Sequence, residues 1–254
     1  PASPGSNNTS APLWRLLQAA AGVVRAVREG ASTTTALAAA PAELRAGAQA
    51  LSFQALRQLG RAQALRARLA HRAPPPAADA LLCTALALAW DPERAPYPPF
   101  TLVDQAVEAA KRTRASAGQA SFVNACLRRF LREREALVAA TDADPVARWN
   151  HPAWWIEQLR RDHPQDWQAI LAASDTPGPM TLRVNARRAS RDAVLHDWRA
   201  AGIACEPVGA HGLLLARPRP VHELPGFDQG LVSVQDAAAQ LAAPLLLEGL
   251  RAPT

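Results

Sequence analysis

The chain has 254 residues, 49% of them apolar and 20% charged, so it can bury a core and most of it is neither disordered nor collagen-like. Its 58 alanines, against one Tyr and five Phe, predict a mainly helical protein, because alanine favours helices and is depleted in strands. The net charge of +6 comes from residues 1–140, which carry 17 basic and 9 acidic side chains, a balance typical of proteins that bind a polyanion such as nucleic acid.

The first predicted element is a tail. Residues 1–12, PASPGSNNTSAP, have no apolar signal core, and we expect them to be disordered. From Leu13 apolar residues recur at helical spacing until Gly30, which predicts an amphipathic helix. Further helices are expected at Pro41–Gly60 and Arg61–Arg72.

A proline run at residues 74–76 separates these helices from an apolar helix at Asp79–Trp90. The segment DPERAPYPPF holds four prolines in ten residues and predicts a loop before a helix at Thr101–Lys111. A longer helix, Gln119–Glu135, follows with apolar residues on one side and arginines on the other. Six or seven helices without a strand pattern predict an all-α domain over residues 13–140.

The sequence after residue 140 is rich in Trp and contains strand patterns. Two short helices are predicted at Pro152–His163 and Pro164–Ala173, and we expect Trp154, Trp155 and Trp167 to be packing residues there. The alternating segment MTLRVN predicts a strand, and Ser190 is placed to cap a helix that Gly202 ends.

The last predicted elements are strands and one helix. Strands are expected at residues 203–208, 212–216 and 231–234, the first two paired around a short turn. A helix should begin at Asp236 and be interrupted at Pro244. These patterns indicate an α+β region after residue 140 whose final elements look unfinished.

Common catalytic and metal-binding patterns are missing from the sequence. The 13 glycines form no GxGxxG or P-loop motif, and the six histidines form no HExxH, so no metal site is expected. Cys83, Cys126 and Cys205 lie too far apart for a metal clip, and their odd number gives no disulfide framework, which fits a reducing cytoplasm. The longest apolar stretch is about half a bilayer span, so no membrane segment is expected.

The positive functional signal is the placement of arginine, which supplies 27 of the 28 basic residues. Four-residue spacing puts Arg128 and Arg132 on one helix face, and a planar guanidinium matches phosphate oxygens two at a time. The candidate nucleic-acid-binding residues are Arg112, Arg114, Arg128, Arg129, Arg132, Arg183, Asn185, Arg187 and Arg188. A solvated helix face, partly neutralised by Glu133 and Glu135, and a merely charged turn after the strand are the simpler interpretations.

Three segments together resemble a known family. They are VNACLRRFLREREAL, HPAWWIEQLRRDHPQDWQAILAASDTPGPMTLRVN and VHELPGFDQGLVSVQDAAAQLAAPLL, in this order. They resemble the front portion of bacterial Sun/RsmB-type 16S ribosomal RNA (cytosine-C5) methyltransferases. The resemblance implies a NusB-like helical RNA-binding domain over 13–140, an α+β RNA-binding subdomain over 141–230, and at 231–254 the start of a Rossmann-like methyltransferase domain.

The family's catalytic motifs do not occur in this chain. They are a DxCAAPGGKT-like loop that holds S-adenosylmethionine, a Pro-Cys motif and a Thr-Cys-Ser motif with the nucleophile. The resemblance therefore implies S-adenosylmethionine for the complete enzyme but an inactive, cofactor-free 254-residue chain, truncated before the catalytic domain. Small-subunit ribosomal RNA is the implied partner of a monomeric, cytoplasmic protein.

Two other classes of function compete with this interpretation. A NusB-like domain could serve a complete, non-enzymatic RNA-binding adaptor of the transcription-antitermination type, but such an adaptor does not need the family-like segment from Trp149 to Leu247. A purely structural helical scaffold does not account for the charge of +8 on residues 1–140.

Overall fold

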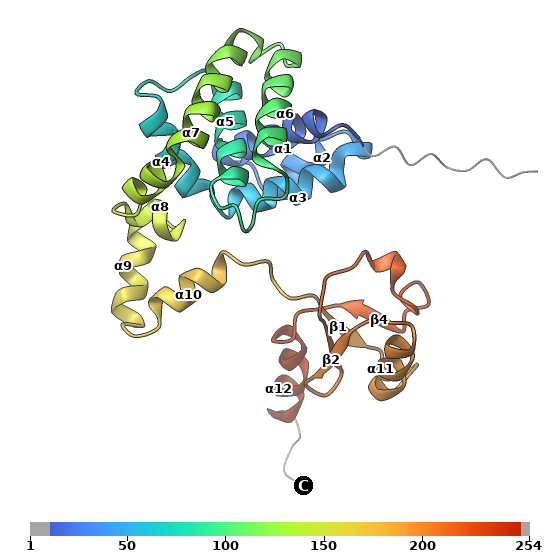
Figure 1. The fold of residues 1–254 in the computed structure, drawn as a ribbon. Coiled ribbons are helices and arrows are strands. Elements are labelled where there is room, and N and C mark those ends of the chain that lie inside the picture. Colours follow the sequence, from blue (N-terminus) through green and yellow to red (C-terminus); the bar gives the residue numbers. More distant parts are fainter. Residues whose placement is uncertain (1–10, 250–254) are drawn as a thin grey trace, which may run out of the picture. The chain divides into compact units, whose positions relative to one another are not determined.

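The computed structural model describes residues 11–249, which form two compact units divided between residues 176 and 177 (Figure 1). The helices of the first unit are α1 (Leu13–Arg28), α2 (Thr33–Ala38), η1 (Ala42–Leu44), α3 (Arg45–Leu56), α4 (Leu59–Leu69), α5 (Pro76–Ala89), α6 (Pro99–Arg112), η2 (Ala117–Gln119), α7 (Ala120–Thr141), α8 (Pro145–Trp149), α9 (Ala153–Asp162) and α10 (Trp167–Ser174). Most of the predicted tail, residues 1–12, lies outside the described residues.

Helix α5 is the centre of the first unit. Every residue from Ala78 to Ala89 is buried, and α5 packs against α1, α3, α4, α6 and α7 (Figure 1). This contact on all sides explains why the helix is apolar around its whole circumference. Its one buried acid, Asp79, is paired with Arg28 at 2.8 Å and Arg66 at 2.9 Å, which compensates a charge that would otherwise be costly to bury.

The structure corrects several predicted helix boundaries. The expected helix at Pro41–Gly60 is η1 and α3, and α4 begins at Leu59. Helices α2 and α8 were not predicted, because segments of six and five residues are too short to show a helical period. Helix α7 continues to Thr141 beyond a bend at Glu133, whose φ and ψ are −112° and 17°.

Helix α8 attaches the segment after α7 to the first unit. Asn150 has a left-handed backbone, with φ 54°, and ends α8. Its Oδ1 accepts a 2.7 Å hydrogen bond from Gly60 N, and its Nδ2 donates one of 3.0 Å to Leu56 O. These bonds connect α8 to α3 and α4, and the first compact unit extends to residue 176.

The second unit is an antiparallel sheet in the order β2-β3-β1-β4. Its elements are β1 (Thr181–Val184), α11 (Arg191–Ala200), β2 (Cys205–Val208), β3 (Gly212–Leu215), η3 (Val221–Glu223), β4 (Val232–Val234), η4 (Ala239–Leu241) and α12 (Ala242–Gly249). Ser190 caps α11 by accepting a hydrogen bond from Ala193 N at 3.2 Å, as expected. The predicted pairing of the second and third strands is also confirmed.

Two predictions for the residues after 140 are wrong. Pro244 does not interrupt a helix, because it lies in the first turn of α12, where a missing N–H breaks no helical hydrogen bond. Trp154 and Trp155 are exposed on α9, although both were expected to be packing residues. Trp167 is half-buried, packs against the core of α9 and α10, and meets Trp149 edge to face.

No helix of residues 11–249 is both long and apolar enough to cross a bilayer.

Candidate nucleic-acid interface

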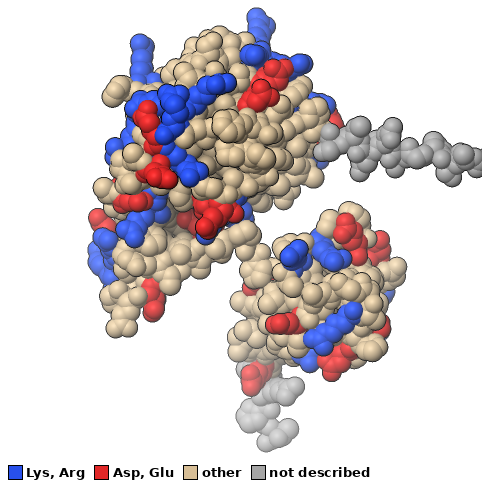
Figure 2. Space-filling view, viewed as in Figure 1, with Lys and Arg blue, Asp and Glu red and all other residues tan. Residues whose placement is uncertain are grey.

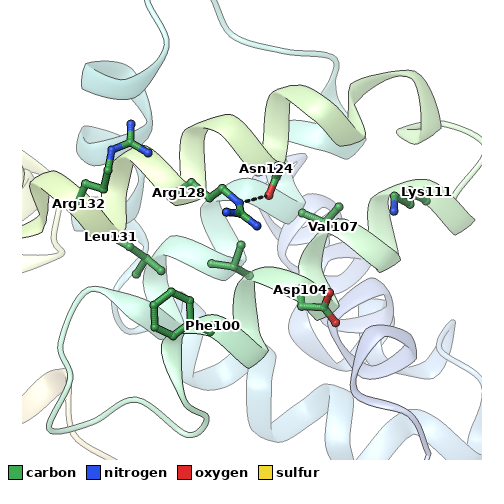
Figure 3. Close-up of a pocket in the computed structure, with 9 residues that line it drawn as sticks. Phe100, Asp104, Val107, Lys111, Asn124, Arg128, Leu131 and Arg132 are labelled. Carbon is green, nitrogen blue, oxygen red and sulfur yellow. Dashed lines mark hydrogen bonds between the residues drawn. The ribbon is translucent and has the colours of Figure 1, made fainter.

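Helices α6 and α7 form an antiparallel pair whose surface carries a basic groove (Figure 3). The short connection at residues 113–119 brings the second helix back along the first. The groove has a volume of about 660 Å³ and is lined by Phe100, Val103, Asp104, Val107, Lys111, Asn124, Arg128, Leu131 and Arg132. We call this surface the α6–α7 groove. Three cations and one acid give it a net positive charge.

The candidate arginines of this region differ in how they are paired. Arg112 forms an ion pair with Glu108 and stacks over the ring of Trp14 at 4.8 Å. Arg129 pairs with Glu133 at 3.0 Å, which confirms that an acid of α7 partly neutralises its basic face. Their charges are therefore already compensated.

Arg114, Arg128 and Arg132 are exposed, and they form no ion pair with another described residue. Arg128 Nε donates a 3.0 Å hydrogen bond to Asn124 Oδ1, which holds the guanidinium at the groove in Figure 3. Its terminal amino groups are left for an anion. Of the expected cluster, Arg128 and Arg132 are the two residues that the structure brings to the α6–α7 groove.

The charge on the visible face of the first unit is uneven. Figure 2 shows Lys and Arg side chains concentrated over α7, with some acidic side chains among them. Further basic and acidic side chains lie over the upper end of α6, and the middle of that face carries few charges in the same view. A polyanion would therefore meet its strongest attraction along α7.

The second candidate group surrounds the end of β1. Arg183, Asn185 and Arg187 line a hollow of about 500 Å³ together with residues of β4. Asn185 Nδ2 donates to Gly230 O at 3.2 Å, and its Oδ1 accepts from Arg187 N at 3.2 Å. Arg188 donates to the carbonyl of Gln229. Asn185 and Arg188 thus hold this turn together, and Arg183 and Arg187 are the exposed charges beside it.

The cysteines have the environment of structural thiols. Burial raises the pKa of Cys83 to about 12, and it also raises the pKa of Cys126 and Cys205. Thiols that stay protonated are poor nucleophiles and poor metal ligands. No group of three or more His, Cys, Asp or Glu side chains within residues 11–249 is arranged to hold a metal ion.

The sequence analysis selected only Arg128 and Arg132 among the residues that line the groove. Phe100 lay inside a predicted loop, Lys111 appeared only as the end of a predicted helix, and Asn124 gave no signal beyond its place four residues before Arg128. Their common role depends on α6 packing against α7, which no local pattern shows.

Comparisons with known proteins match two successive parts of the chain, and the second match begins within the first compact unit. Residues 17–132 match the model of the NusB family, and residues 151–222 match that of the "Methyltr_RsmF/B-like, ferredoxin-like domain". The crystal structure of PH0851 has a similar fold, with a TM-score of 0.63 and 15% sequence identity, over 92% of this chain and 55% of that one.

Several curated relatives are called ribosomal RNA small subunit methyltransferase B. The Pseudomonas putida protein is 48% identical over 128 residues, which are 49% of this chain and 29% of the relative. The Vibrio cholerae protein is 40% identical over 127 residues, 49% of this chain and 29% of the relative. A probable member from Coxiella burnetii is 36% identical over 151 residues, 59% of this chain and 35% of the relative. These matches cover about a third of the length of the relatives.

The chain thus has a NusB-like part followed by a part similar to the ferredoxin-like domain of the RsmF/B-like methyltransferase class. Within that class, the chain is similar to the N-terminal part of proteins named ribosomal RNA small subunit methyltransferase B. The resemblance noted in the sequence is thereby confirmed.

Proposed function

We propose that this chain is the RNA-recognition portion of an S-adenosylmethionine-dependent methyltransferase that modifies cytosine C5 in small-subunit ribosomal RNA. The order of its domains, NusB before ferredoxin-like, is the observation that carries the proposal. A non-enzymatic NusB-like adaptor would need only the first domain. We further propose that the protein acts as a cytoplasmic monomer without a metal ion.

The proposed contacts with RNA are electrostatic. Arg114, Arg128 and Arg132 offer uncompensated guanidinium groups on the first unit, and Arg183 and Arg187 do so on the second. Such groups hold phosphate oxygens and orient a folded RNA without reading its sequence. Arg112 and Arg129 would join only by exchanging an acidic partner for a phosphate, and Asn185 and Arg188 would shape the turn.

The α6–α7 groove does not suit the cofactor. S-adenosylmethionine carries a sulfonium cation, whereas Lys111, Arg128 and Arg132 make the groove positive, so the two would repel. We therefore assign no cofactor site to the groove and derive no chemical step from it. Methyl transfer and the cytosine C5 target belong to the complete enzyme.

Binding of small-subunit ribosomal RNA tests the proposal. We expect the chain to bind fragments of this RNA, and we expect Arg128→Glu with Arg132→Glu to weaken binding by at least tenfold, since each change replaces an attraction with a repulsion. Arg72→Glu is the matched control, because Arg72 is exposed on the same unit and does not line the groove. Equal loss in the control, or no RNA binding by the unaltered chain, would contradict the proposal.

A further inference from the structure

Phe100 is unusually placed for an apolar side chain. It is 82% exposed at the start of α6, whereas the other four phenylalanines are buried or half-buried. Phenylalanine has no polar group to offer water. Exposed apolar side chains that lie together at a groove mark a binding surface more often than single, scattered ones do. Figure 3 shows it beside Leu131 at one end of the α6–α7 groove, away from Lys111.

Phe100 lines two hollows. One is the α6–α7 groove, and the other, of about 560 Å³, is lined by Pro99, Phe100 and residues 131–136 of α7. Leu131 and Arg132 also line both. Phe100 therefore borders open space, and Arg132 of α7 lines the same two hollows.

From this arrangement we infer that the α6–α7 groove binds an unpaired RNA nucleotide, with its base stacked on Phe100 and its phosphates held by Arg128 and Arg132. Every base has a π-face, so stacking on an aromatic side chain needs no particular sequence. The positive charge of Arg128 and Arg132 complements the negative charge of the RNA backbone. Because the Phe100 ring and the guanidinium groups lie at different places along one groove, they can contact the base and the phosphates of one nucleotide at the same time. The inference rests on the proposed function and adds to it a preference for single-stranded loops over paired stems.

A protein partner with an apolar side chain is the competing occupant. The net positive charge of the groove favours a polyanion, and Arg128 has its terminal amino groups free for phosphate oxygens. A contact with an apolar side chain would need only the hydrophobic area of Phe100, whereas a base needs its flat ring. This difference separates the two occupants by experiment.

Substitutions of Phe100 test the inference in the full chain. The probes are a small-subunit ribosomal RNA hairpin with an unpaired loop and a fully paired duplex of equal length. We expect Phe100→Ala to weaken binding of the hairpin by about fivefold or more, because stacking of one base on an aromatic side chain raises the affinity by about that factor or more. Binding of the duplex should be unchanged. Phe100→Leu should behave like Phe100→Ala, and Phe100→Trp should bind like the unaltered chain.

Leu245→Ala is the matched control, because Leu245 is a large apolar residue that is 65% exposed on α12 of the second unit. This substitution should change neither the affinity for the hairpin nor the affinity for the duplex. Circular dichroism should show all variants folded, since none of the side chains is buried. A crosslink from 4-thiouridine in the loop to Phe100 or a neighbouring groove residue would support the inference directly.

The possible outcomes are distinct. Hairpin binding unchanged in Phe100→Ala, or kept in Phe100→Leu, would overturn the stacking role, and the second result would favour an apolar partner. Equal weakening for hairpin and duplex would overturn the preference for an unpaired nucleotide. If the unaltered chain bound neither probe, the proposed function itself would fail, whereas hairpin binding that is insensitive to Phe100 removes only this inference.

Discussion

Trp198 is the largest fully buried side chain of the second unit. Only 1% of its surface is exposed, and its indole Nε1 donates a 3.1 Å hydrogen bond to Pro225 O. Trp154, by contrast, is 67% exposed on α9. The two side chains have the same chemistry, but only the first removes its apolar surface from water in the described structure.

We therefore expect Trp198→Ala to lower the free energy of unfolding by about 3–5 kcal/mol, as large aromatic truncations in a core do. Trp154→Ala should lower it by less than about 1 kcal/mol, since this side chain lies mainly in solvent. Urea unfolding followed by circular dichroism measures both. Similar losses for the two variants would show that the exposed tryptophan is packed in solution.

Asp175 links protonation to stability in the first unit. Burial raises its pKa above the ordinary value of 3.8, although a 3.1 Å hydrogen bond from Asn150 Nδ2 acts in the opposite direction. The folded state holds the proton of Asp175 more tightly than the unfolded state does. The contribution of this protonation to the free energy of unfolding is therefore fully present below pH 3.8. It is lost as the pH rises through the raised value.

Asp175→Asn should remove the fall in the free energy of unfolding that accompanies deprotonation of Asp175. The variant has no proton to release, and its amide oxygen can still accept a hydrogen bond from Asn150. Its stability relative to the unaltered chain should therefore increase as the pH rises from below 3.8. Unfolding in urea at a series of pH values measures the difference, with Asp228→Asn as an exposed control. A difference independent of pH would mean that Asp175 does not titrate as described.

The junction of α4 and α8 depends on a close backbone approach. A Cβ on Gly60 would lie 2.5 Å from Val146 O, and Asn150 Oδ1 already accepts from Gly60 N. Nothing lies within 4 Å of a Cβ on Gly118, in η2. Gly60 is thus required by packing, while Gly118 has open space.

Gly60→Ala should lower the free energy of unfolding by about 1–3 kcal/mol, because the clash with α8 outweighs the better helix propensity of alanine. Gly118→Ala should be neutral or slightly stabilising. Urea unfolding of the two variants compares an identical chemical change at a filled and an open site. If both proved neutral, α8 would not pack on α4 as closely as described.

At the scale of the whole molecule, charge should govern the affinity for RNA. Binding through several phosphates releases counterions, so the logarithm of the association constant should fall linearly with the logarithm of salt concentration. Replacing Arg128 and Arg132 with alanine should make that slope shallower by about one for each phosphate that the chain no longer binds. Phe100→Ala carries no charge change and should leave the slope intact.

Filter binding or fluorescence anisotropy from about 50 to about 200 mM salt measures these slopes, over the range in which phosphate binding has its strongest effect. The control is Arg72→Ala, which should keep the slope of the unaltered chain. An affinity independent of salt would contradict the electrostatic interpretation, whatever its absolute value.

The amino-acid sequence alone determined much of this molecule. Helical periodicity located α1 and α7, and alternation located β1, because both patterns arise from which face of an element is buried. A continuous apolar stretch located α5, which is buried on all sides. Four-residue spacing also placed Arg128 and Arg132 on one face of α7. The order of the family-like segments indicated the Sun/RsmB type.

Only the tertiary structure decided which side chains meet. Local spacing cannot show that α6 packs against α7 and so joins Phe100 and Lys111 to Arg128, nor that Glu108 and Glu133 compensate Arg112 and Arg129. It also cannot tell a buried Trp198 from an exposed Trp154, because burial depends on what another element places opposite a side chain. Periodicity records that a face is apolar or charged, whereas its partner is set by long-range packing.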